Sequence, residues 1–221
     1  MSHKDALATG EKERDYWFTV LLTDPVAVPV TRFIARHRLL SPDAVSALAL
    51  FTGLCVGGLF ALGTRTGLVL GGVTFYVAFV FDCVDGKLAR ALAVSSPRGE
   101  ALDRLADGGR RASASLGLAV YLWRAEGVVD ATVWWAVTYA IAAYYFLEIS
   151  GAERARGGAG LGGRLSAMLA RRRLLPNPGM PDVQAVVFIF GPLTGLVVPA
   201  LAVGIGMVAA AIVLTLWRRL R

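Results

Sequence analysis

Residues 81–107 read FDCVDGKLARALAVSSPRGEALDRLAD, and the four aspartates in this stretch lie where a membrane protein has most reason to avoid charge. The stretch directly follows an uncharged run, GLVLGGVTFYVAFV, from Gly67 to Val80. An ionised side chain at the centre of a membrane helix costs about 2.5–3.5 kcal/mol even on biological insertion scales. The aspartates therefore predict a function that requires them.

The overall composition indicates a chain embedded in lipid. Of its 221 residues, 56% are hydrophobic and 18% are charged, and the mean hydropathy is +0.58. Soluble domains carry more charge, whereas the recurring apolar runs here are long enough to cross the hydrocarbon core as helices. The sequence predicts an all-α integral membrane protein. Its net charge of +7 is interpreted as basic loops that meet anionic lipid headgroups, and no nucleic-acid partner is expected.

Six apolar segments are expected to form transmembrane helices. Their approximate bounds are Pro42–Leu62, Gly67–Leu92, Gly99–Trp123, Val128–Ile149, Asp182–Val198 and Ala200–Trp217. The fifth and sixth meet at Pro199, so one broken helix is an alternative there. Cys55 and Cys83 fall inside apolar segments and are interpreted as packing residues rather than a disulfide.

Two further regions precede the first span. Residues 1–15 form a polar tail that lacks the layout of a cleavable signal peptide. The following stretch is apolar, but Pro25 and Pro29 interrupt it, and proline stops a continuous helix. Residues 16–40 are therefore predicted to be an amphipathic juxtamembrane helix at the interface, and residues 41–221 the six-helix transmembrane domain.

Basic residues gather in alternate loops and predict the orientation. Arginines precede the first span, fill the loop between the fourth and fifth spans, and follow the sixth, while the other loops carry little charge. Since cytoplasmic loops hold the excess of Lys and Arg, both termini are predicted to be cytoplasmic in a multi-pass protein of the inner membrane.

The four aspartates form two pairs with helical spacing. Asp82 and Asp85 are three apart and Asp103 and Asp107 are four apart, and both spacings place a pair on one helix face. Pro97 ends the first helix, so an antiparallel hairpin can bring the two acidic faces together at the cytoplasmic end. Ligation by oxygen alone suits Mg²⁺ or Mn²⁺. Two such ions would balance four carboxylates, and two-metal sites commonly serve phosphoryl transfer.

Small residues and one arginine accompany the acidic pairs. Gly86 and Ala89 leave a shallow patch where a bulky ligand could approach, and Arg90 offers a fork suited to phosphate oxygens. The full pattern is Asp82-x2-Asp85-Gly86-x2-Ala89-Arg90-x8-Gly99-x3-Asp103-x3-Asp107. It resembles the signature of the CDP-alcohol phosphatidyltransferase family.

This resemblance implies a homodimeric transferase of phospholipid biosynthesis whose active site faces the cytoplasm. A small alcohol, such as inositol phosphate or glycerol phosphate, would attack the lipid-linked phosphate of a CDP-linked lipid, expected to be CDP-diacylglycerol, and CMP would leave. Asp82, Asp85, Asp103 and Asp107 would hold two divalent ions, Mg²⁺ or Mn²⁺, and Asp107 would also act as the general base.

The resemblance also implies binding residues. Gly86, Ala89 and Gly99 would make room for the nucleotide, and Arg90 would hold its pyrophosphate. SPDAVS at residues 41–46 resembles the family's Pro-Asn-x-x-Thr element, which adds Asp43 and Ser46 to the nucleotide pocket although both differ from the family's residues.

Four arginines are candidates for binding the acceptor's phosphate. In relatives that use inositol phosphate, basic residues hold this phosphate in the loop that carries Arg154 and Arg156 here, although charge topology alone also explains this pair. Arg110 and Arg111 either bind phosphate or balance the acidic cluster. The run Arg171–Arg173 is interpreted as facing headgroups.

Two matters stay open at the level of sequence. The acids alone would also suit a divalent-cation or proton-coupled transporter, but a transporter does not explain the spacing of the small residues and Arg90. The identity of the acceptor alcohol is not specified, and Gly108-Gly109 departs from the basic residue that many relatives carry after the fourth aspartate.

Overall fold

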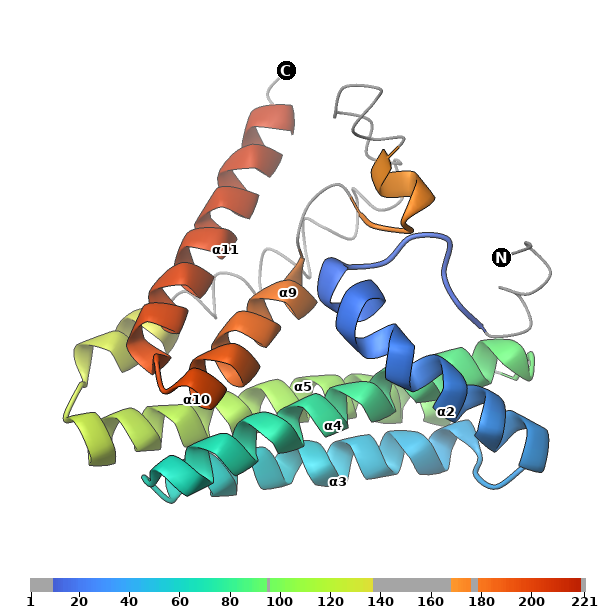
Figure 1. Ribbon diagram of the computed structural model, residues 1–221, viewed down its shortest axis with the longest axis horizontal. Helices are drawn as coiled ribbons and strands as arrows, with labels where there is room; N and C mark the ends of the chain where they lie inside the picture. The colour runs from blue at the N-terminus through green and yellow to red at the C-terminus, as the bar shows by residue number, and fades with distance from the viewer. Residues whose placement is uncertain (1–9, 95, 137–167, 176–178, 220–221) are drawn as a thin grey trace.

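The computed structural model describes residues 10–94, 96–136, 168–175 and 179–219. The regular secondary structure of these residues is entirely helical, as predicted. One isolated β-bridge within the described part of the chain pairs Asp15 with Leu174. Figure 1 shows a layer of three long helices with the other described helices on one side of it. The long helices are α3 (Pro42–Ala61), α4 (Arg65–Ala91) and α5 (Pro97–Tyr121), and α5 continues into the π-helical turn η2 (Leu122–Glu126).

Hydroxyl caps define where the three long helices begin. Ser41, Thr64 and Ser96 each accept a hydrogen bond from the backbone N–H three residues later, at 3.2, 3.0 and 2.9 Å. Such side chains satisfy N–H groups that the first turn leaves without partners. Pro42 and Pro97 occupy the first turn, where the missing N–H is not needed. These caps start α4 and α5 two residues earlier than the predicted spans.

Glycines allow α3 and α5 to approach closely. A Cβ at Gly57 would collide with the backbone and side chain of Ser113, and one at Gly117 would collide with the backbone of Gly57. The gap also contains hydrogen bonds, because the Ser113 hydroxyl donates to the Leu54 carbonyl at 2.7 Å and accepts from the Gly57 N–H at 3.1 Å. The two helices can therefore hold residues of the site at a fixed separation.

The chain before α3 is helical through both of its prolines. The π-helical turn η1 (Thr19–Thr23) leads directly into α2 (Asp24–His37), with Pro25 in the first turn of α2 and Pro29 inside it. The predicted interruption was therefore wrong. Pro25 comes directly after the π-turn, where the regular hydrogen-bond pattern of the helix is already altered, and the helix continues past Pro29.

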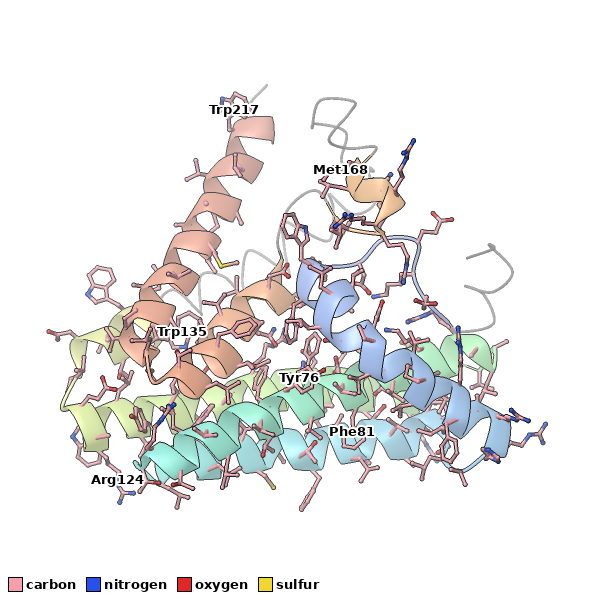
Figure 2. The ribbon with its side chains drawn as sticks, in the orientation of Figure 1. Tyr76, Phe81, Arg124, Trp135, Met168 and Trp217 are labelled. Carbon is pink, nitrogen blue, oxygen red and sulfur yellow. The ribbon has the colours of Figure 1, made fainter. Side chains whose placement is uncertain are left out.

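Helix α2 and its leading turn pack on α4. Ala27 and Ile34 of α2 are buried with Val84 and Leu88 of α4 in one apolar cluster. The Tyr76 hydroxyl, labelled in Figure 2, donates to the Leu22 carbonyl at 2.8 Å. Helix α2 therefore has a fixed position beside the acidic half of α4.

The last apolar segments form two helices rather than one broken helix. Helix α9 (Met180–Ala185), the π-turn η4 (Val186–Phe190) and α10 (Gly191–Thr194) run on without interruption, and α11 (Val197–Arg219) returns alongside them (Figure 1). The reversal occurs at Gly195, whose φ of +82° favours glycine. Pro199 lies in the first turn of α11 and is not the break.

Among the described residues, three helices are long and apolar enough to cross a membrane: α3, α4 and residues Val197–Leu214 of α11. Residues Met180–Thr194 form a shorter apolar helix. The predicted fourth span, Val128–Ile149, lies mostly outside the described residues. In its described part, residues 130–136 are helical. The prediction of six spans is therefore neither confirmed nor contradicted by the helices described.

Candidate active site

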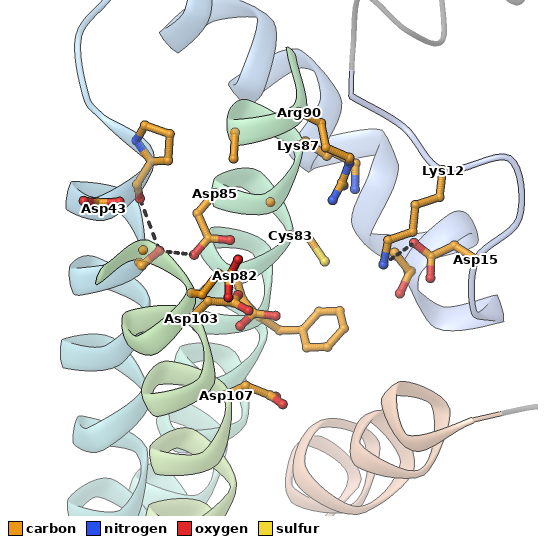
Figure 3. A pocket seen from close by; sticks show the side chains of 18 of the residues that line it. Lys12, Asp15, Asp43, Asp82, Cys83, Asp85, Lys87, Arg90, Asp103 and Asp107 are labelled. Carbon is orange, nitrogen blue, oxygen red and sulfur yellow. Dashed lines mark hydrogen bonds and ion pairs between the residues drawn. The ribbon is translucent and has the colours of Figure 1, made fainter. Parts of the chain in front are cut away.

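A cavity of about 1200 Å³ lies at the end of the helical layer where α4 finishes and α5 begins. Its walls come from α3, α4, α5, α9 and the segment before η1 (Figure 3). Most of the predicted site residues line it together, namely Asp43, Ser46, Asp82, Asp85, Gly86, Ala89, Arg90, Gly99, Asp103, Asp107 and Arg111. We call Asp82, Asp85, Asp103 and Asp107 the signature aspartates, and the α4–α5 hairpin brings them to one cavity as predicted.

Asp85 is the most deeply placed signature aspartate. Its side chain is 97% buried, and its Oδ2 atom accepts a hydrogen bond of 2.5 Å from the Ser46 hydroxyl. In the described part of the chain, its Oδ1 atom has no hydrogen-bond partner, and neither does the buried Oδ1 of Asp82. Ser46, predicted to bind nucleotide, therefore orients a signature aspartate. Of the two oxygens without a hydrogen-bonding donor, Asp85 Oδ1 is available to a cation, whereas Asp82 Oδ1 already lies 3.5 Å from Arg110 Nη1.

Arg110 lies behind the acidic cluster and does not line the cavity. Its side chain is only 1% exposed, its Nη2 lies 2.8 Å from Asp107 Oδ1, and its Nη1 lies 3.5 Å from Asp82 Oδ1. The guanidinium also lies over the rings of Phe75 and Phe79, at 5.4 and 5.0 Å from their centroids. The structure does not support the hypothesis that Arg110 binds the acceptor's phosphate, because the group is buried among the protein's own side chains.

Arg111, on the same helix, is exposed to the cavity where Arg110 is buried. It lines the cavity, is partly exposed, and its Nη2 lies 2.8 Å from Asp107 Oδ2. Both oxygens of Asp107 are thus paired with arginines, one buried and one at the cavity surface. Arg111 is therefore the member of the pair that a phosphate in the cavity can reach.

The α3–α5 side of the cavity is closely packed. A Cβ at Gly99 would lie 2.7 Å from Asp43 Oδ1, so a larger residue there would displace this carboxylate. Arg90 is held at the end of α4, where its Nε donates to the Gly10 carbonyl at 2.6 Å. The glycine and the arginine of the signature therefore have distinct local reasons for their positions.

The segment that the sequence described as a polar tail instead forms part of the site. Lys12 and Asp15 line the cavity, and Figure 3 shows them on the side opposite Asp43. Asp15 pairs through its backbone with residues 173 and 175, with N···O distances of 2.8 and 2.9 Å. Since these partners are more than 150 residues apart in the chain, no local pattern could have revealed the contact.

Arg173 is responsible for much of this attachment. Its guanidinium pairs with Glu11 at 2.5 Å, lies 3.4 Å from Asp24, and donates to the Lys12 carbonyl at 2.9 Å. The expectation that this arginine faces lipid headgroups was therefore wrong. Asp24 also pairs with the buried Lys87 of α4 at 2.8 Å, so α2, α4 and the N-terminal segment meet at one buried charge cluster.

Helix α9 supplies a third wall that the sequence analysis did not anticipate. Met180, Pro181 and Gln184 line the cavity, and Asp182 anchors the helix start by accepting hydrogen bonds of 2.7 Å from the N–H groups of Phe18 and Gly179. Arg154 and Arg156, predicted to bind the acceptor's phosphate, lie outside the described residues.

A sequence model of CDP-alcohol phosphatidyltransferase matches residues 39–217, which is most of the chain. The chain belongs to the CDP-alcohol phosphatidyltransferase family. This membership confirms the resemblance drawn from the signature, and with the apolar helices it identifies an integral membrane protein.

This CDP-alcohol phosphatidyltransferase family member is similar to a protein compared by sequence and to a solved structure compared by fold. A bifunctional IPC transferase and DIPP synthase of Rubrobacter xylanophilus is 44% identical over 68 residues, which cover 31% of this chain and 15% of that protein. The chain thus matches only a small part of that relative. A crystal structure of Mycobacterium tuberculosis phosphatidylinositol phosphate synthase (PgsA1) with CDP-DAG bound gives a TM-score of 0.57 at 25% identity, covering 89% of this chain and 92% of that one.

The donor groups of the cavity fit a hard divalent cation, on which this family generally depends. Carboxylate oxygens are the ligands that Mg²⁺ and Mn²⁺ prefer, and Asp82 and Asp85 each present a buried oxygen without a hydrogen-bonding donor. Within the described residues, no three acidic, histidine or cysteine side chains converge tightly enough to enclose one ion. Asp107 is not turned towards a common ion site, because its two oxygens face Arg110 and Arg111.

Proposed function

We propose that this protein transfers a phosphatidyl group from CDP-diacylglycerol to a small alcohol and releases CMP. The observation that carries the proposal is the meeting of both acidic pairs at one cavity, together with Gly86, Ala89 and Arg90 of the same signature. A transporter would explain the acids, but the family membership and the lining of the cavity favour a transferase.

The nucleotide would occupy the side of the cavity formed by α3 and the α4–α5 hairpin. Gly86 and Ala89 leave an open surface on α4, and Gly99 keeps the start of α5 close to Asp43. Arg90 would reach the pyrophosphate, with its guanidinium already directed by the Gly10 carbonyl. The structure of the PgsA1 enzyme, which is similar in fold, has CDP-DAG bound and supports this class of donor.

The signature aspartates would hold two divalent ions, Mg²⁺ or Mn²⁺. When bound, these ions would neutralise the carboxylates and stabilise the charge that develops on the transferred phosphate. Asp85 is best prepared for this role, since its buried Oδ1 has no hydrogen-bond partner among the described residues and Ser46 fixes its orientation. Asp82 would bind metal in place of its contact with Arg110. Asp103 lines the same cavity from α5.

Asp107 would accept the proton of the attacking alcohol. The alcohol oxygen forms a bond to the lipid-linked phosphorus, the bond from that phosphorus to the CMP oxygen breaks, and CMP leaves with the electron pair. Arg110 holds Asp107 from behind at 2.8 Å, so the carboxylate is positioned at the cavity surface. Arg111 can turn from Asp107 to a substrate phosphate, because its side chain is partly exposed.

The membrane arrangement completes the proposal. The protein would cross the inner membrane six times, with residues 16–40 along the interface, both termini and the cavity on the cytoplasmic side, and a second copy as its partner in a homodimer. The basic loops support this orientation. Arg154 and Arg156, in the most basic loop, would bind the acceptor if its alcohol is phosphorylated.

The most informative test offers purified protein labelled CDP-diacylglycerol with a panel of acceptors that includes inositol phosphate, glycerol phosphate, serine and inositol. The proposal expects a new labelled lipid with at least one phosphorylated alcohol, formed in step with CMP. A folded protein that forms no lipid with any acceptor would contradict it.

A further inference from the structure

The wall of the cavity that faces away from the nucleotide side is built by two elements far apart in the chain. The N-terminal segment contributes Lys12, and α9 contributes Gln184. Figure 3 shows Lys12 across the signature aspartates from Asp43. Lys12 lies before residue 39, where the match to the family begins, so the family signature does not account for it.

Gln184 is a buried polar side chain whose oxygen lacks a partner. It is 97% buried, it lines the cavity, and no described residue donates a hydrogen bond to its Oε1 atom. A buried amide oxygen left without a hydrogen bond is unfavourable, so such groups in native proteins usually meet a ligand or an ordered water. Because the Oε1 atom itself is covered, a hydroxyl group in the cavity would satisfy it after a turn of the amide.

The backbone of Lys12 is held by hydrogen bonds, while its side chain is exposed. The Lys12 carbonyl accepts hydrogen bonds from Arg173 Nε at 3.2 Å and Nη2 at 2.9 Å, and two residues earlier the Gly10 carbonyl accepts from Arg90. The side chain is over half exposed, and its Nζ lies 4.0 Å from Asp15 Oδ2, the limit of an ion pair. The lysine is thus held at the cavity with its charge available to an anion.

On this basis, which rests on the proposed function, we propose that Lys12 and Gln184 form the acceptor subsite and select a phosphorylated polyol. Lys12 binds the phosphate that the acceptor already carries, and the Gln184 amide accepts a hydrogen bond from one of its hydroxyls. The nucleotide lies towards Asp43 and Gly99 with its pyrophosphate at Arg90, and Lys12, two residues from the Gly10 that Arg90 binds, holds the acceptor's phosphate beside it. Neither residue takes part in bond making, and both determine which alcohol is held.

Binding without the CDP-linked lipid tests the subsite independently of catalysis. The purified full chain is titrated with inositol phosphate, glycerol phosphate, inositol and inorganic phosphate, and in a separate series with CDP-diacylglycerol, while its thermal midpoint is followed. Lys12→Ala should weaken binding of the phosphorylated polyols about tenfold or more and leave the neutral inositol series unchanged. Lys12→Arg should retain binding.

Gln184 is tested by removing or replacing its amide. Gln184→Met, similar in length, should weaken inositol and inositol phosphate about tenfold. Gln184→Glu keeps an accepting oxygen, so it should retain inositol and weaken inositol phosphate by charge repulsion; it carries the test if Gln184→Met does not fold. CDP-diacylglycerol binding should stay within about twofold in every variant, a margin equal to less than one hydrogen bond.

Arg14→Ala is the matched control, since Arg14 is an exposed cation two residues from Lys12 that does not line the cavity. The subsite is overturned if Arg14→Ala weakens the polyol as much as Lys12→Ala, if the variants weaken CDP-diacylglycerol equally, or if the wild type binds neither phosphorylated polyol. A wild type that shows the predicted binding pattern but releases no CMP would instead contradict the proposed function.

Discussion

Replacing Arg110 should destabilise the fold far more than replacing its neighbour Arg111, although both arginines pair with Asp107. Arg110 is 1% exposed and pairs with Asp107 and Asp82, whereas the side chain of Arg111 is 27% exposed and, among the described residues, pairs with Asp107 alone. Arg110→Met would leave the largely buried Asp82 carboxylate without its cation. Breaking a buried pair in this way typically costs about 3–5 kcal/mol, against about 0–1 kcal/mol for an exposed pair.

The aromatic contacts of Arg110 add to this difference. Its guanidinium lies 5.0 Å from the Phe79 ring centroid, and a desolvated contact of this kind contributes about 2 kcal/mol. In a chain of this size each kcal/mol shifts the thermal midpoint by about 2–4 °C, so the ion pair alone predicts a loss of about 6–20 °C for Arg110→Met.

The assay compares the thermal midpoints of detergent-solubilised wild type, Arg110→Met, Arg110→Lys and Arg111→Met. Each midpoint is the temperature at which half of the protein is no longer monodisperse. Arg110→Lys should fall between the wild type and Arg110→Met, because an ammonium keeps the charge but cannot pair with two carboxylates as a planar fork does. The reasoning is refuted if Arg110→Met and Arg111→Met lower the midpoint equally, or if Arg110→Met raises it.

Three further predictions follow from the helix contacts, the aspartates and the charge distribution. Gly57→Ala should lower stability by about 1–3 kcal/mol because its Cβ meets Ser113, whereas Gly58→Ala, which meets nothing within 4 Å, should be neutral or stabilising; equal midpoints for the two variants would contradict the close α3–α5 contact. Asp85→Asn should lose activity, and excess Mg²⁺ or Mn²⁺ should partly restore it. Asp107→Asn should lower kcat about 10²–10⁴-fold, and added metal should not restore it. Activity measured against metal concentration separates the two variants, and full rescue of Asp107→Asn would exclude its role as a base. A single cysteine at position 160 of a variant lacking Cys55 and Cys83 should resist a membrane-impermeant thiol reagent in intact cells, and ready labelling would reverse the proposed orientation.

The sequence predicts the α4–α5 hairpin well because its signals are local. Helical spacing places each acidic pair on one face, and the turn between the helices brings both pairs to one cavity. The expectation that Pro97 ends the first helix was wrong, because α4 already ends at Ala91 and Pro97 instead lies in the first turn of α5 after its Ser96 cap. Local signals also set the limits of this approach. Two prolines indicated an interruption before α3, but the structure accommodates both within the helix, and the reversal before α11 depends on Gly195 rather than on Pro199.

Contacts between distant segments could not be predicted in this way. The three-residue offset from Asp107 puts Arg110 near an acid, but only the packing of α5 against α4 shows that it is buried beneath Asp82 rather than facing a substrate. Likewise, Lys12 and Gln184 reach the cavity because Arg173 and Asp182 fasten the N-terminal segment to residues more than 150 positions away. No spacing within either segment carries that information.

Release of CMP from CDP-diacylglycerol by the purified protein is the most direct test of the central claim. We predict that CMP appears only when a divalent cation and an acceptor alcohol are both present, in equal amount to the new lipid. Asp82→Asn and Asp85→Asn should abolish its release at low metal concentration while the proteins remain folded. If the folded wild type releases no CMP with any acceptor, or if both variants release it at the wild-type rate, the cavity of the signature aspartates is not the site of phosphatidyl transfer.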